Sequence, residues 1–400
     1  KREGIESQLF EDQPGRANLY ARLPGDGSGK ALMLVHHMDV VPARPEEWTV
    51  PPFDGEVRDG YVWGRGAVDN KGSGVMELLA VVLMKRLNLP LSRDLVLLAV
   101  ADEEQGGAHG ARYMMREHAA LFRDVEFALN EGGMMLGLNS GRTLYAVEFA
   151  QKVPLWLRLV ASGPAGHASL PKHEAATHRL ARALARLDQF EFPITVVPAV
   201  QTVFTQRAAT MPPAQQAAYR DLARSLQQPD FLRDFEKDPR DAAMIRNSIA
   251  ITMLTGSSKE NVYPAEASAV VDLRLLPGED PEAVTAKLKQ VMNEPEVRIE
   301  PLLSSVAHAS PLDTELFKAI ERLVARHAPG AVVTPNFIAG FTDCNTFRAG
   351  GITCYGFMPL AMPMSEVERL HGRDERIAIQ AFVEGTQRMH ELVRDLAGRR

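Results

Sequence analysis

The sequence is poor in cysteine and carries no excess of positive charge. Its 400 residues include two cysteines, Cys344 and Cys354, which exclude a disulfide framework and leave at most one bridge open, so the redox compartment is undetermined. The 51 acidic and 45 basic residues give a formal net charge of -6, which argues against a phosphate-binding surface. We therefore expect no nucleic-acid partner.

Long hydrophobic runs are also missing. The longest apolar stretch, Val75 to Leu83, contains Glu77 and is followed by Lys85 and Arg86. It is too short and too interrupted to span a bilayer, so we interpret it as a buried helix and expect no membrane span. The first residue is Lys1 rather than Met, so the compartment stays open between cytoplasmic and exported.

The first 150 residues alternate strand and helix patterns. Strands are expected at Ala31 to Val35, Leu95 to Ala101 and Val125 to Leu129, and a helix at Gly110 to His118. A longer helix is expected from Ser73 to Asn88, with its apolar positions at Val75, Leu78, Leu79, Val82 and Leu83. This order indicates a parallel βαβ arrangement.

The pattern changes at about Gln151. Alternating strands are expected at Pro154 to Ala161, Ser248 to Leu254 and Ala267 to Leu275, with helices at His173 to Asp188 and Pro281 to Met292 and a strand around Val297. Such strands with two helices suggest an antiparallel sheet covered on one face. The polar, helix-favouring segment from Gln201 to Arg246 is interpreted as an insertion.

From Leu312 the first pattern returns, with a helix to His327, a strand at Ile352 to Phe357 and a closing helix from Arg376 to Leu396. We therefore predict an α/β fold in which residues 1–150 and 304–400 form a catalytic domain around a mostly parallel central sheet flanked by helices. Residues 151–303 are predicted to form a smaller inserted α+β lid or dimerisation domain, with its insertion at about 201–246.

Acidic and imidazole side chains follow the apolar runs, where an open α/β sheet builds its site. They suit a paired divalent-metal centre and are His37, Asp69, Glu103, Glu104, Glu131 and His371. Asp39, two residues after His37, can accept a hydrogen bond from the second ring nitrogen of that histidine. Taken alone, a histidine beside an aspartate is more often a surface or core pair.

Asp69 lies in the glycine-rich stretch GRGAVDNKGSG, before the first long helix. A phosphate loop would require a Gly-Lys-Ser/Thr order, which is absent because the order here is Lys71, Gly72, Ser73. A carboxylate held by a tight turn at a helix start can instead bridge two cations.

Glu103 and Glu104 follow the most apolar predicted strand. Adjacent residues point in different directions, so one can bind a metal while the other accepts a proton from the attacking water. The alternative is a solvated acidic turn, and we expect Asp102 to be only that.

The motifs, taken together and in order, resemble the M20 family of metallopeptidases, also called the aminoacylase-1 or carboxypeptidase G2-like family. The resemblance runs from about residue 31 to the C-terminus and rests on HHMDVVP, WTVPPFDGEVRDGYVWGRGAVDNKG, ADEEQGGAHGA, ALNEGG, GPAGHASLP, NVYPAEASAVVDLRLLPG, FTDCNTFRAGGITCYGF and LHGRDERI.

The resemblance implies two Zn²⁺ ions per chain, with Co²⁺ or Mn²⁺ also compatible with nitrogen and oxygen ligands. It implies metal binding by His37, Asp69 (bridging), Glu104, Glu131 and His371. Glu103 would be the general base, and Asp39 would orient His37.

The resemblance also assigns residues of the smaller domain. His167 would stabilise the developing oxyanion, in dimeric members from the neighbouring subunit, although a plain loop histidine is the alternative. Asn261 and Arg274 would contact the substrate, and Arg274 suits a free carboxylate unless it only pairs with Asp272. Thr342 is a further substrate-contacting position.

Three departures from the family pattern stand out. His36 occupies a place where many members carry glycine. The opening helical segment is missing, so the sequence is either truncated or dispenses with it. The insertion from Gln201 to Arg246 resembles the carboxypeptidase S and N-acyl-amino-acid hydrolase branch.

The predicted function is therefore hydrolysis of a peptide or N-acyl bond next to a free carboxylate, in a small peptide or N-acyl amino acid, by a protein that can form a homodimer. One alternative is a deacylase of the succinyl-diaminopimelate or acetylornithine type. An alternative of another class is a binding protein that keeps the fold without metal.

Overall fold

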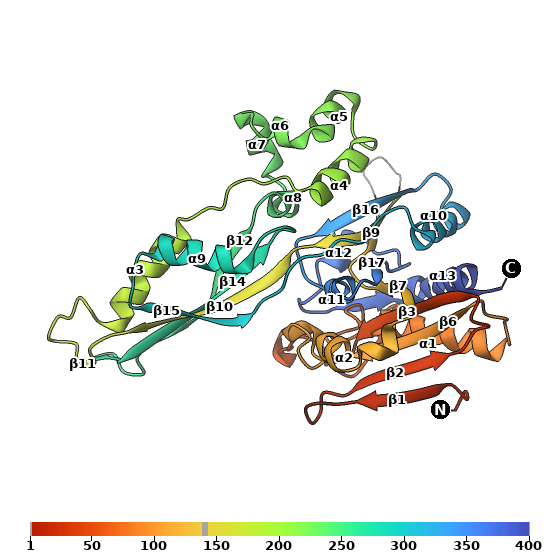
Figure 1. The fold of residues 1–400 in the computed structure, drawn as a ribbon, viewed down its shortest axis with the longest axis horizontal. Helices are drawn as coiled ribbons and strands as arrows, with labels where there is room; N and C mark the ends of the chain where they lie inside the picture. The colour runs from red at the N-terminus through yellow and green to blue at the C-terminus, as the bar shows by residue number, and fades with distance from the viewer. Residues whose placement is uncertain (1, 138–142, 400) are drawn as a thin grey trace. The chain divides into compact units, whose positions relative to one another are not determined.

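The computed structural model describes residues 2–137 and 143–399 (Figure 1). The chain divides into two compact units. Unit 1 comprises Lys1–Phe149, Ser310–Asn336 and Thr342–Arg400, and unit 2 comprises Ala150–Ala309 and Phe337–Phe341. Unit 1 is thus built from segments that lie far apart in the sequence.

A nine-stranded sheet with a parallel centre, in the order β1-β2-β6-β3-β7-β17-β9-β16 with β8 beside β9, organises unit 1. Its strands are β1 (Glu6–Phe10), β2 (Asn18–Leu23), β3 (Gly29–His37), β6 (Arg93–Val100), β7 (Val125–Asn130), β8 (Met134–Gly137), β9 (Thr143–Gln151), β16 (Val332–Ile338) and β17 (Thr353–Gly356). The central pairs β6–β3, β3–β7 and β7–β17 are parallel, and β1, β2, β8 and β9 make antiparallel pairs. A short sheet joins β4 (Glu56–Arg58), β5 (Tyr61–Trp63) and β18 (Arg376–Ala378).

Helices cover both faces of the large sheet. On one face α1 (Lys71–Arg86) and α13 (Ile379–Ala397) pack on each other and on β3 and β6, with α10 (Glu315–His327) against α13. On the other face α2 (Ala111–Glu117) and α11 (Cys344–Ala349) bury apolar side chains against the strands. The remaining helical segments are α12 (Met364–Val367) and the 3-10 turns Pro45–Glu47, Glu103–Gln105 and Ala119–Phe122. The predicted α/β class is confirmed.

The predicted apolar face of α1 is wrong, although the helix itself forms. Val75, Leu78 and Leu79 are exposed, whereas Met76, Glu77, Ala80, Val81 and Met84 are buried. The reason lies in the neighbouring strand: Nδ1 of the His36 ring lies 2.9 Å from Oε2 of the buried Glu77. A Cβ at Gly74 would lie 2.4 Å from that ring, so glycine at this position makes room for His36.

Two helix starts also differ from the sequence prediction. Residues Arg376–Ala378 form β18 against β5, so the last helix begins at Ile379 rather than at Arg376. The helix expected from His173 begins at Ala176. The two cysteines, left open by the sequence, form a disulfide between α11 and β17, and both are fully buried.

Unit 2 contains an antiparallel sheet in the order β12-β14-β10-β15. Its strands are β10 (Val153–Ser162), β12 (Ser248–Thr255), β14 (Glu266–Leu275) and β15 (Val297–Leu303), and a separate pair joins β11 (Gly166–His167) to β13 (Val262–Tyr263). The helices α3 (Ala176–Asp188) and α9 (Pro281–Met292) cover one face with an apolar core. Between α3 and β12 the chain also forms α4 (Pro198–Ala208), α5 (Pro213–Arg220), α6 (Leu222–Ser225), α7 (Pro229–Phe235) and α8 (Pro239–Met244).

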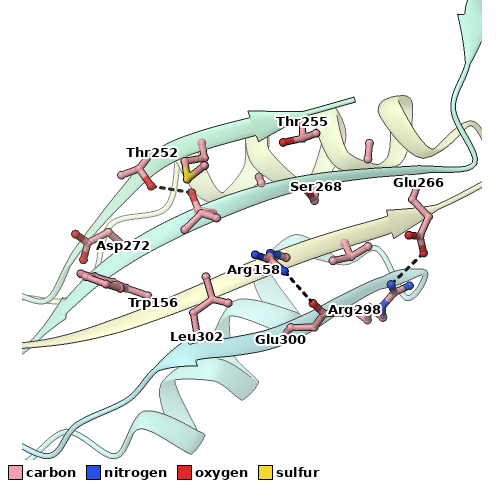
Figure 2. A pocket seen from close by; sticks show the side chains of 15 residues that line it. Trp156, Arg158, Thr252, Thr255, Glu266, Ser268, Asp272, Arg298, Glu300 and Leu302 are labelled. Atoms are coloured by element: carbon pink, nitrogen blue, oxygen red, sulfur yellow. Dashed lines mark hydrogen bonds and ion pairs between the residues drawn. The ribbon is translucent and has the colours of Figure 1, made fainter. Parts of the chain in front are cut away.

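The other face of this sheet is open. It forms a hollow of about 700 Å³ lined by side chains from all four strands, among them Trp156, Asp272 and Leu302 (Figure 2). Across it, Arg158 faces Glu300 at 4.0 Å and Arg298 faces Glu266 at 3.0 Å. These exposed ion pairs contribute little stability. Among the described residues, none of the helices has the length and apolar character needed to cross a bilayer.

Lys152, just before β10, is fully buried, and its ammonium group donates to the Ser248 hydroxyl at 3.2 Å. Burial, aided by the positive charge of Arg274, lowers the pKa of Lys152 from 10.5 to about 8. Among the described residues this lysine has no acidic partner, and a buried charge without one is unfavourable. This lysine therefore costs stability at neutral pH.

We expect Lys152→Met to raise the free energy of unfolding at pH 7 by about 3 kcal/mol through this charge term. The folded state binds the proton more weakly than the unfolded chain, so the wild-type protein gains stability as the pH rises from about 8 to 10.5. The difference between variant and wild type should therefore shrink over that range, as measured by urea unfolding. The exposed Lys287→Met is the matched control, and a pH-independent difference for Lys152→Met would contradict the interpretation.

Candidate metal centre

Three adjacent parallel strands of unit 1 end at the same edge of the sheet. His37 is the last residue of β3, Glu103 follows β6 and Glu131 follows β7 directly. Because β6, β3 and β7 are neighbours in parallel register, with His37 opposite Val100, their carboxyl ends meet. The chain topology thus gathers these side chains at one place.

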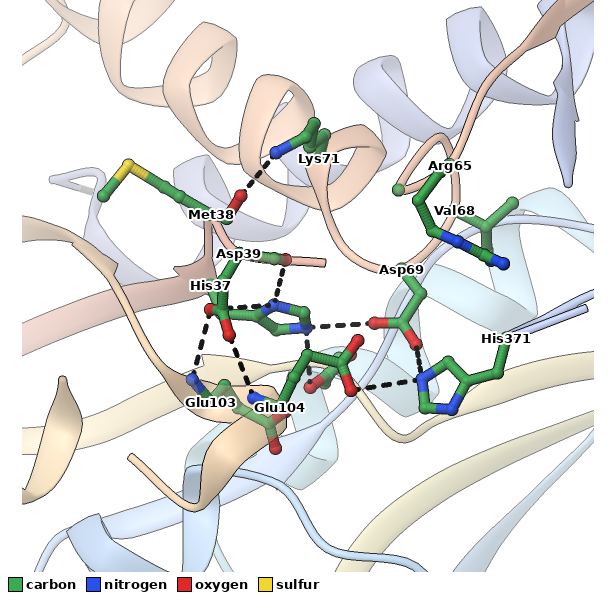
Figure 3. A network of polar contacts seen from close by, with 12 residues as sticks. His37, Met38, Asp39, Arg65, Val68, Asp69, Lys71, Glu103, Glu104 and His371 are labelled. Atoms are coloured by element: carbon green, nitrogen blue, oxygen red, sulfur yellow. Dashed lines mark hydrogen bonds and ion pairs between the residues drawn. The ribbon is translucent and has the colours of Figure 1, made fainter. Parts of the chain in front are cut away.

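Asp69 joins two histidines that come from distant parts of the chain (Figure 3). Its Oδ1 lies 2.9 Å from His37 Nε2, and its Oδ2 lies 3.0 Å from His371 Nε2. His37 Nε2 also lies 3.4 Å from Glu131 Oε1, and His371 Nε2 lies 3.3 Å from Glu104 Oε2. Each oxygen of Asp69 therefore faces a different histidine and a different second carboxylate.

Asp39 holds the neighbouring elements in place. Its backbone carbonyl lies 3.0 Å from His37 Nδ1, which leaves Nε2 directed at the carboxylates, whereas its Oδ1 lies 3.6 Å from Nδ1. The Asp39 carboxylate instead accepts hydrogen bonds from the backbone N–H groups of Glu103 and Glu104, each at 3.1 Å. Asp39 thus orients His37 through its main chain and the Glu103–Glu104 turn through its side chain.

Glu103 and Glu104 begin a short 3-10 turn after β6. Glu104 faces His371, while Oε1 of each glutamate is buried without a hydrogen-bond partner among the described residues.

The expectation that Asp102 is a solvated acidic residue is wrong: this side chain is buried and pairs with Arg16, and it accepts a hydrogen bond from His109 N–H. It anchors the turn rather than facing solvent.

The electrostatics reflect the crowding of acidic groups. Burial opposes a charge on His37, but Glu131, Asp39 and Asp69 outweigh burial and raise the pKa of His37 well above its ordinary value. Hydrogen bonds to Asp69 and Glu104 raise the pKa of His371 to about 10.

The pKa values of two buried carboxyl groups of the cluster are raised as well. Burial raises the pKa of Glu131 to about 7, with His37 opposing and Asp69 adding to the rise. Burial, together with the charges of Glu131 and Asp343, raises the pKa of Glu103 well above its ordinary value. Such a cluster favours bound positive charge.

The donor set fits divalent metal ions. Two groups of three ligand atoms each lie within 4.8 Å of one another: His37 with Asp69 and Glu104, and His37 with Glu103 and Glu131. Imidazole nitrogens and carboxylate oxygens suit Zn²⁺ and also accept Co²⁺ or Mn²⁺. The unpartnered oxygens of Glu103 and Glu104 leave acceptor capacity for a cation or for water.

Two further acidic residues beside the cluster were missed from the sequence. Asp343 is buried, its Oδ1 has no hydrogen-bond partner among the described residues, and burial raises its pKa to about 7. Glu375 is fully buried and binds the backbone of the Asp69 turn. Asp343 directly follows Thr342, and Glu375 lies four residues after His371. This closeness to predicted site residues was the signal in the sequence that could have revealed them.

The candidate residues of unit 2 fall into two groups. His167 in β11 is exposed, and its Nδ1 accepts from Ser169 N–H at 3.2 Å. Asn261 is also exposed, and its carbonyl accepts from Ala168 N–H at 2.9 Å, so these two residues lie together. Arg274 lies near the other end of β14, where its guanidinium binds Asp272 through two hydrogen bonds of 2.9 and 3.0 Å.

Thr342 in unit 1 is buried, and its hydroxyl accepts from Cys344 N–H at 3.3 Å. This contact lies at the start of α11, next to Asp343. The hydroxyl therefore helps to hold the turn that carries Asp343.

Comparison with known proteins gives consistent results. The sequence model of peptidase family M20/M25/M40 matches residues 33–395. The chain is 28% identical to probable carboxypeptidase S-like 2 of Dictyostelium discoideum over 387 residues, covering 92% of this chain and 72% of that protein. It is 29% identical to N-fatty-acyl-amino acid synthase/hydrolase PM20D1 of Xenopus tropicalis over 399 residues, covering 92% of this chain and 73% of that protein.

Solved structures share the fold. An M20 family metallo-carboxypeptidase from Sulfolobus solfataricus matches with a TM-score of 0.75 and 20% identity over 98% of this chain and 90% of that chain. A protein of Bacillus subtilis described as a dinuclear metal binding peptidase from the M20 family matches with a TM-score of 0.58 and 13% identity, over 98% of this chain and 87% of that chain.

Metal binding should depend on Asp69. We expect Zn²⁺ at 100 times its dissociation constant to stabilise the metal-free wild-type protein by about 2.7 kcal/mol per equivalent bound, measured as a rise in melting temperature. Asp69→Asn, which keeps the shape and removes the charge, should lose most of this rise. Asp94→Asn, an acid that binds Arg22 at the opposite end of β6, should keep it. Equal stabilisation of Asp69→Asn and wild type would exclude Asp69 as a ligand.

Proposed function

The chain belongs to the peptidase family M20/M25/M40 and is a metallopeptidase or amidohydrolase of that family; we propose that it is a dinuclear zinc amidohydrolase that cleaves a peptide or N-acyl bond next to a free carboxylate. The observation that carries this proposal is the position of Asp69, whose two oxygens face two different histidines. A carboxylate so placed can bind one ion with each oxygen.

We assign the metal ligands as His37, Glu131 and Asp69 on one side, and Asp69, Glu104 and His371 on the other. The donor distances of the chain support this division, because Glu131 contacts His37 and Glu104 contacts His371. Bound divalent ions would supply Lewis acidity and lower the pKa of water.

Glu103 is proposed as the general base. It is buried in the cluster, and its Oε1 is free of protein hydrogen bonds among the described residues. Its pKa is raised above the ordinary value of a glutamate, and this direction favours proton transfer near neutral pH. In hydrolysis Glu103 accepts a proton from the attacking water and passes it to the leaving nitrogen as the C–N bond breaks and the new C–O bond forms.

His167 and Arg274 are proposed to act on the substrate from unit 2, with Asn261 beside His167. The imidazole of His167 would donate a hydrogen bond to the developing oxyanion. Arg274, held in a fixed orientation by Asp272, would pair with the substrate carboxylate. Thr342 is retained as a substrate-contacting position beside Asp343.

The geometry of unit 2 favours a shared site. Glu266 and Arg274 are separated by most of β14, and at about 3.4 Å per residue this distance is roughly 27 Å. His167 and Asn261 lie beyond the Glu266 end of the strand. In Figure 1 β11 likewise lies at the far tip of unit 2, away from the Arg274 end of β14. One small substrate cannot touch His167 and Arg274 of the same unit 2. We therefore propose a homodimer in which His167 and Asn261 serve the partner's metal centre.

We propose the preferred class of acyl group from the names of two relatives. One is named probable carboxypeptidase S-like 2, and the other is named N-fatty-acyl-amino acid synthase/hydrolase PM20D1. These names support apolar N-acyl amino acids and short peptides as substrates over the charged intermediates of a biosynthetic deacylase.

Glu103→Gln should bind metal normally and lose about 10² to 10⁴ in kcat, because the amide cannot accept the proton of the attacking water. The assay is a panel of apolar N-acyl amino acids and dipeptides, with succinyl-diaminopimelate and acetylornithine included. Glu117→Gln, an exposed glutamate at the end of α2, is the control and should be unaffected. Turnover confined to the two intermediates would contradict the proposed substrate class, and a near-normal rate in Glu103→Gln would exclude it as the base.

Mixing two inactive variants tests the shared site. His167→Ala and Glu103→Ala homodimers should each be nearly inactive, and random subunit exchange should restore about a quarter of the wild-type rate. Half of the dimers are then mixed, and in each of these one of two sites has both residues intact. No recovery, with exchange verified by mass spectrometry, would place His167 in the site of its own chain.

A further inference from the structure

The carboxylate of Glu375 is saturated with hydrogen bonds. Oε2 accepts from Arg65 Nη1 at 2.7 Å and from Gly66 N–H at 3.1 Å. Oε1 accepts from Val68 N–H at 2.9 Å and from Asp69 N–H at 3.0 Å. A carboxylate offers about four lone-pair sites, so these four donors fill it.

This saturation separates Glu375 from the ligand candidates. Glu375 is buried, and among the described residues its carboxylate accepts the four hydrogen bonds given above and contacts neither histidine. Glu103 and Glu104, by contrast, each keep an oxygen without a hydrogen bond. Glu375 therefore does not bind a metal itself.

All four donors belong to one turn, residues 65 to 69, which ends in Asp69. Three of them are backbone N–H groups, so the carboxylate fixes the path of the main chain rather than the position of one side chain. The single cationic donor, Arg65, is also buried, and it donates to the Gly372 carbonyl at 2.6 Å and lies over the Trp48 ring. The charge of Glu375 is thus neutralised inside the same contact.

Glu375 also links the two segments that carry Asp69 and His371. His371 is four residues before Glu375, and the Glu375 carbonyl accepts from Gly64 N–H at 2.9 Å. Directly after Glu375, β18 pairs with β5, which leads into the Asp69 turn. Main-chain and side-chain contacts of one residue therefore join two ligand segments that are distant in sequence.

Metal sites require their ligands to be held within a few tenths of an ångström. We propose that Glu375 is a positioning residue that holds the Asp69 turn against the His371 segment and so sets the affinity for the divalent ion shared by Asp69, Glu104 and His371. This inference rests on the proposed dinuclear site. It assigns to Glu375 a role in metal affinity rather than in proton transfer.

The test is a titration of the metal-free protein with Co²⁺. Binding is measured by calorimetry, and the coordination geometry is measured by the visible absorption bands of Co²⁺. In Glu375→Gln one oxygen is replaced by an NH₂ group that faces N–H donors, so two hydrogen bonds of the turn are lost. We expect two Co²⁺ to bind wild type, and the affinity for one of them to fall about 10- to 100-fold in Glu375→Gln with a changed spectrum.

Glu366→Gln is the matched control. Glu366 is a buried glutamate of the same C-terminal segment, and it binds Arg376 at 2.7 and 2.9 Å without touching the Asp69 turn. It should lower the melting temperature of the metal-free protein while leaving both Co²⁺ affinities and the spectrum unchanged. A merely structural role of Glu375 would give the same result as this control.

The outcomes separate the two proposals. Fewer than two Co²⁺ bound by wild type would overturn the dinuclear site itself. Two Co²⁺ in wild type with unchanged affinities in Glu375→Gln would overturn the role of Glu375 alone. If Glu375→Gln does not fold, Glu375→Asp, which keeps the charge but shortens the side chain, is titrated in the same way, and unchanged binding by the folded variant is equally decisive.

Discussion

The arrangement of unit 1 depends on one constraint, which is the repulsion between the buried carboxylates gathered at one edge of its sheet. The ends of β3, β6 and β7 and the Asp69 turn bring at least four acidic side chains to two imidazoles. Negative charges this close oppose folding unless positive charge is supplied. The raised pKa values of His37, Glu103 and Glu131 are the response of the chain alone. Around this cluster, the carboxylates of Asp39, Asp102 and Glu375 accept hydrogen bonds from backbone N–H groups. These hydrogen bonds hold the segments that carry the candidate ligands together against the repulsion between their charges.

The sequence was most informative where chemistry and secondary structure coincide. His37 and Glu131 lie at the ends of parallel strands, and the position of a strand end can be read from an apolar run followed by polar residues. The α/β class and the antiparallel sheet of the second unit follow from the same periodicity. Family motifs then supplied roles that no single position could indicate.

Tertiary contacts explain what sequence patterns did not reveal. The buried face of α1 depends on His36 and Gly74, whose contact joins a strand to a helix, so the apolar spacing of the helix alone indicated the wrong side. Asp102 is buried and pairs with Arg16 from the connection between β1 and β2, far away in the sequence. Glu375 serves a turn about 300 residues earlier in the chain, a pairing that local propensity cannot express.

The order of strands in unit 1 has a consequence for synthesis on the ribosome. β17 lies between β7 and β9 in the sheet, yet more than 200 residues separate it from both in the chain. At about 5 to 20 residues per second, the nascent chain waits roughly 10 to 40 s between the emergence of β9 and that of β17. During that interval the central position of the sheet has no strand, so the edges of β7 and β9 are open to other chains. Unit 2, whose sheet closes within a continuous stretch of sequence, can fold first. The most vulnerable species of this protein is thus a nascent chain with one finished unit and one split sheet, which is the form that chaperones would meet.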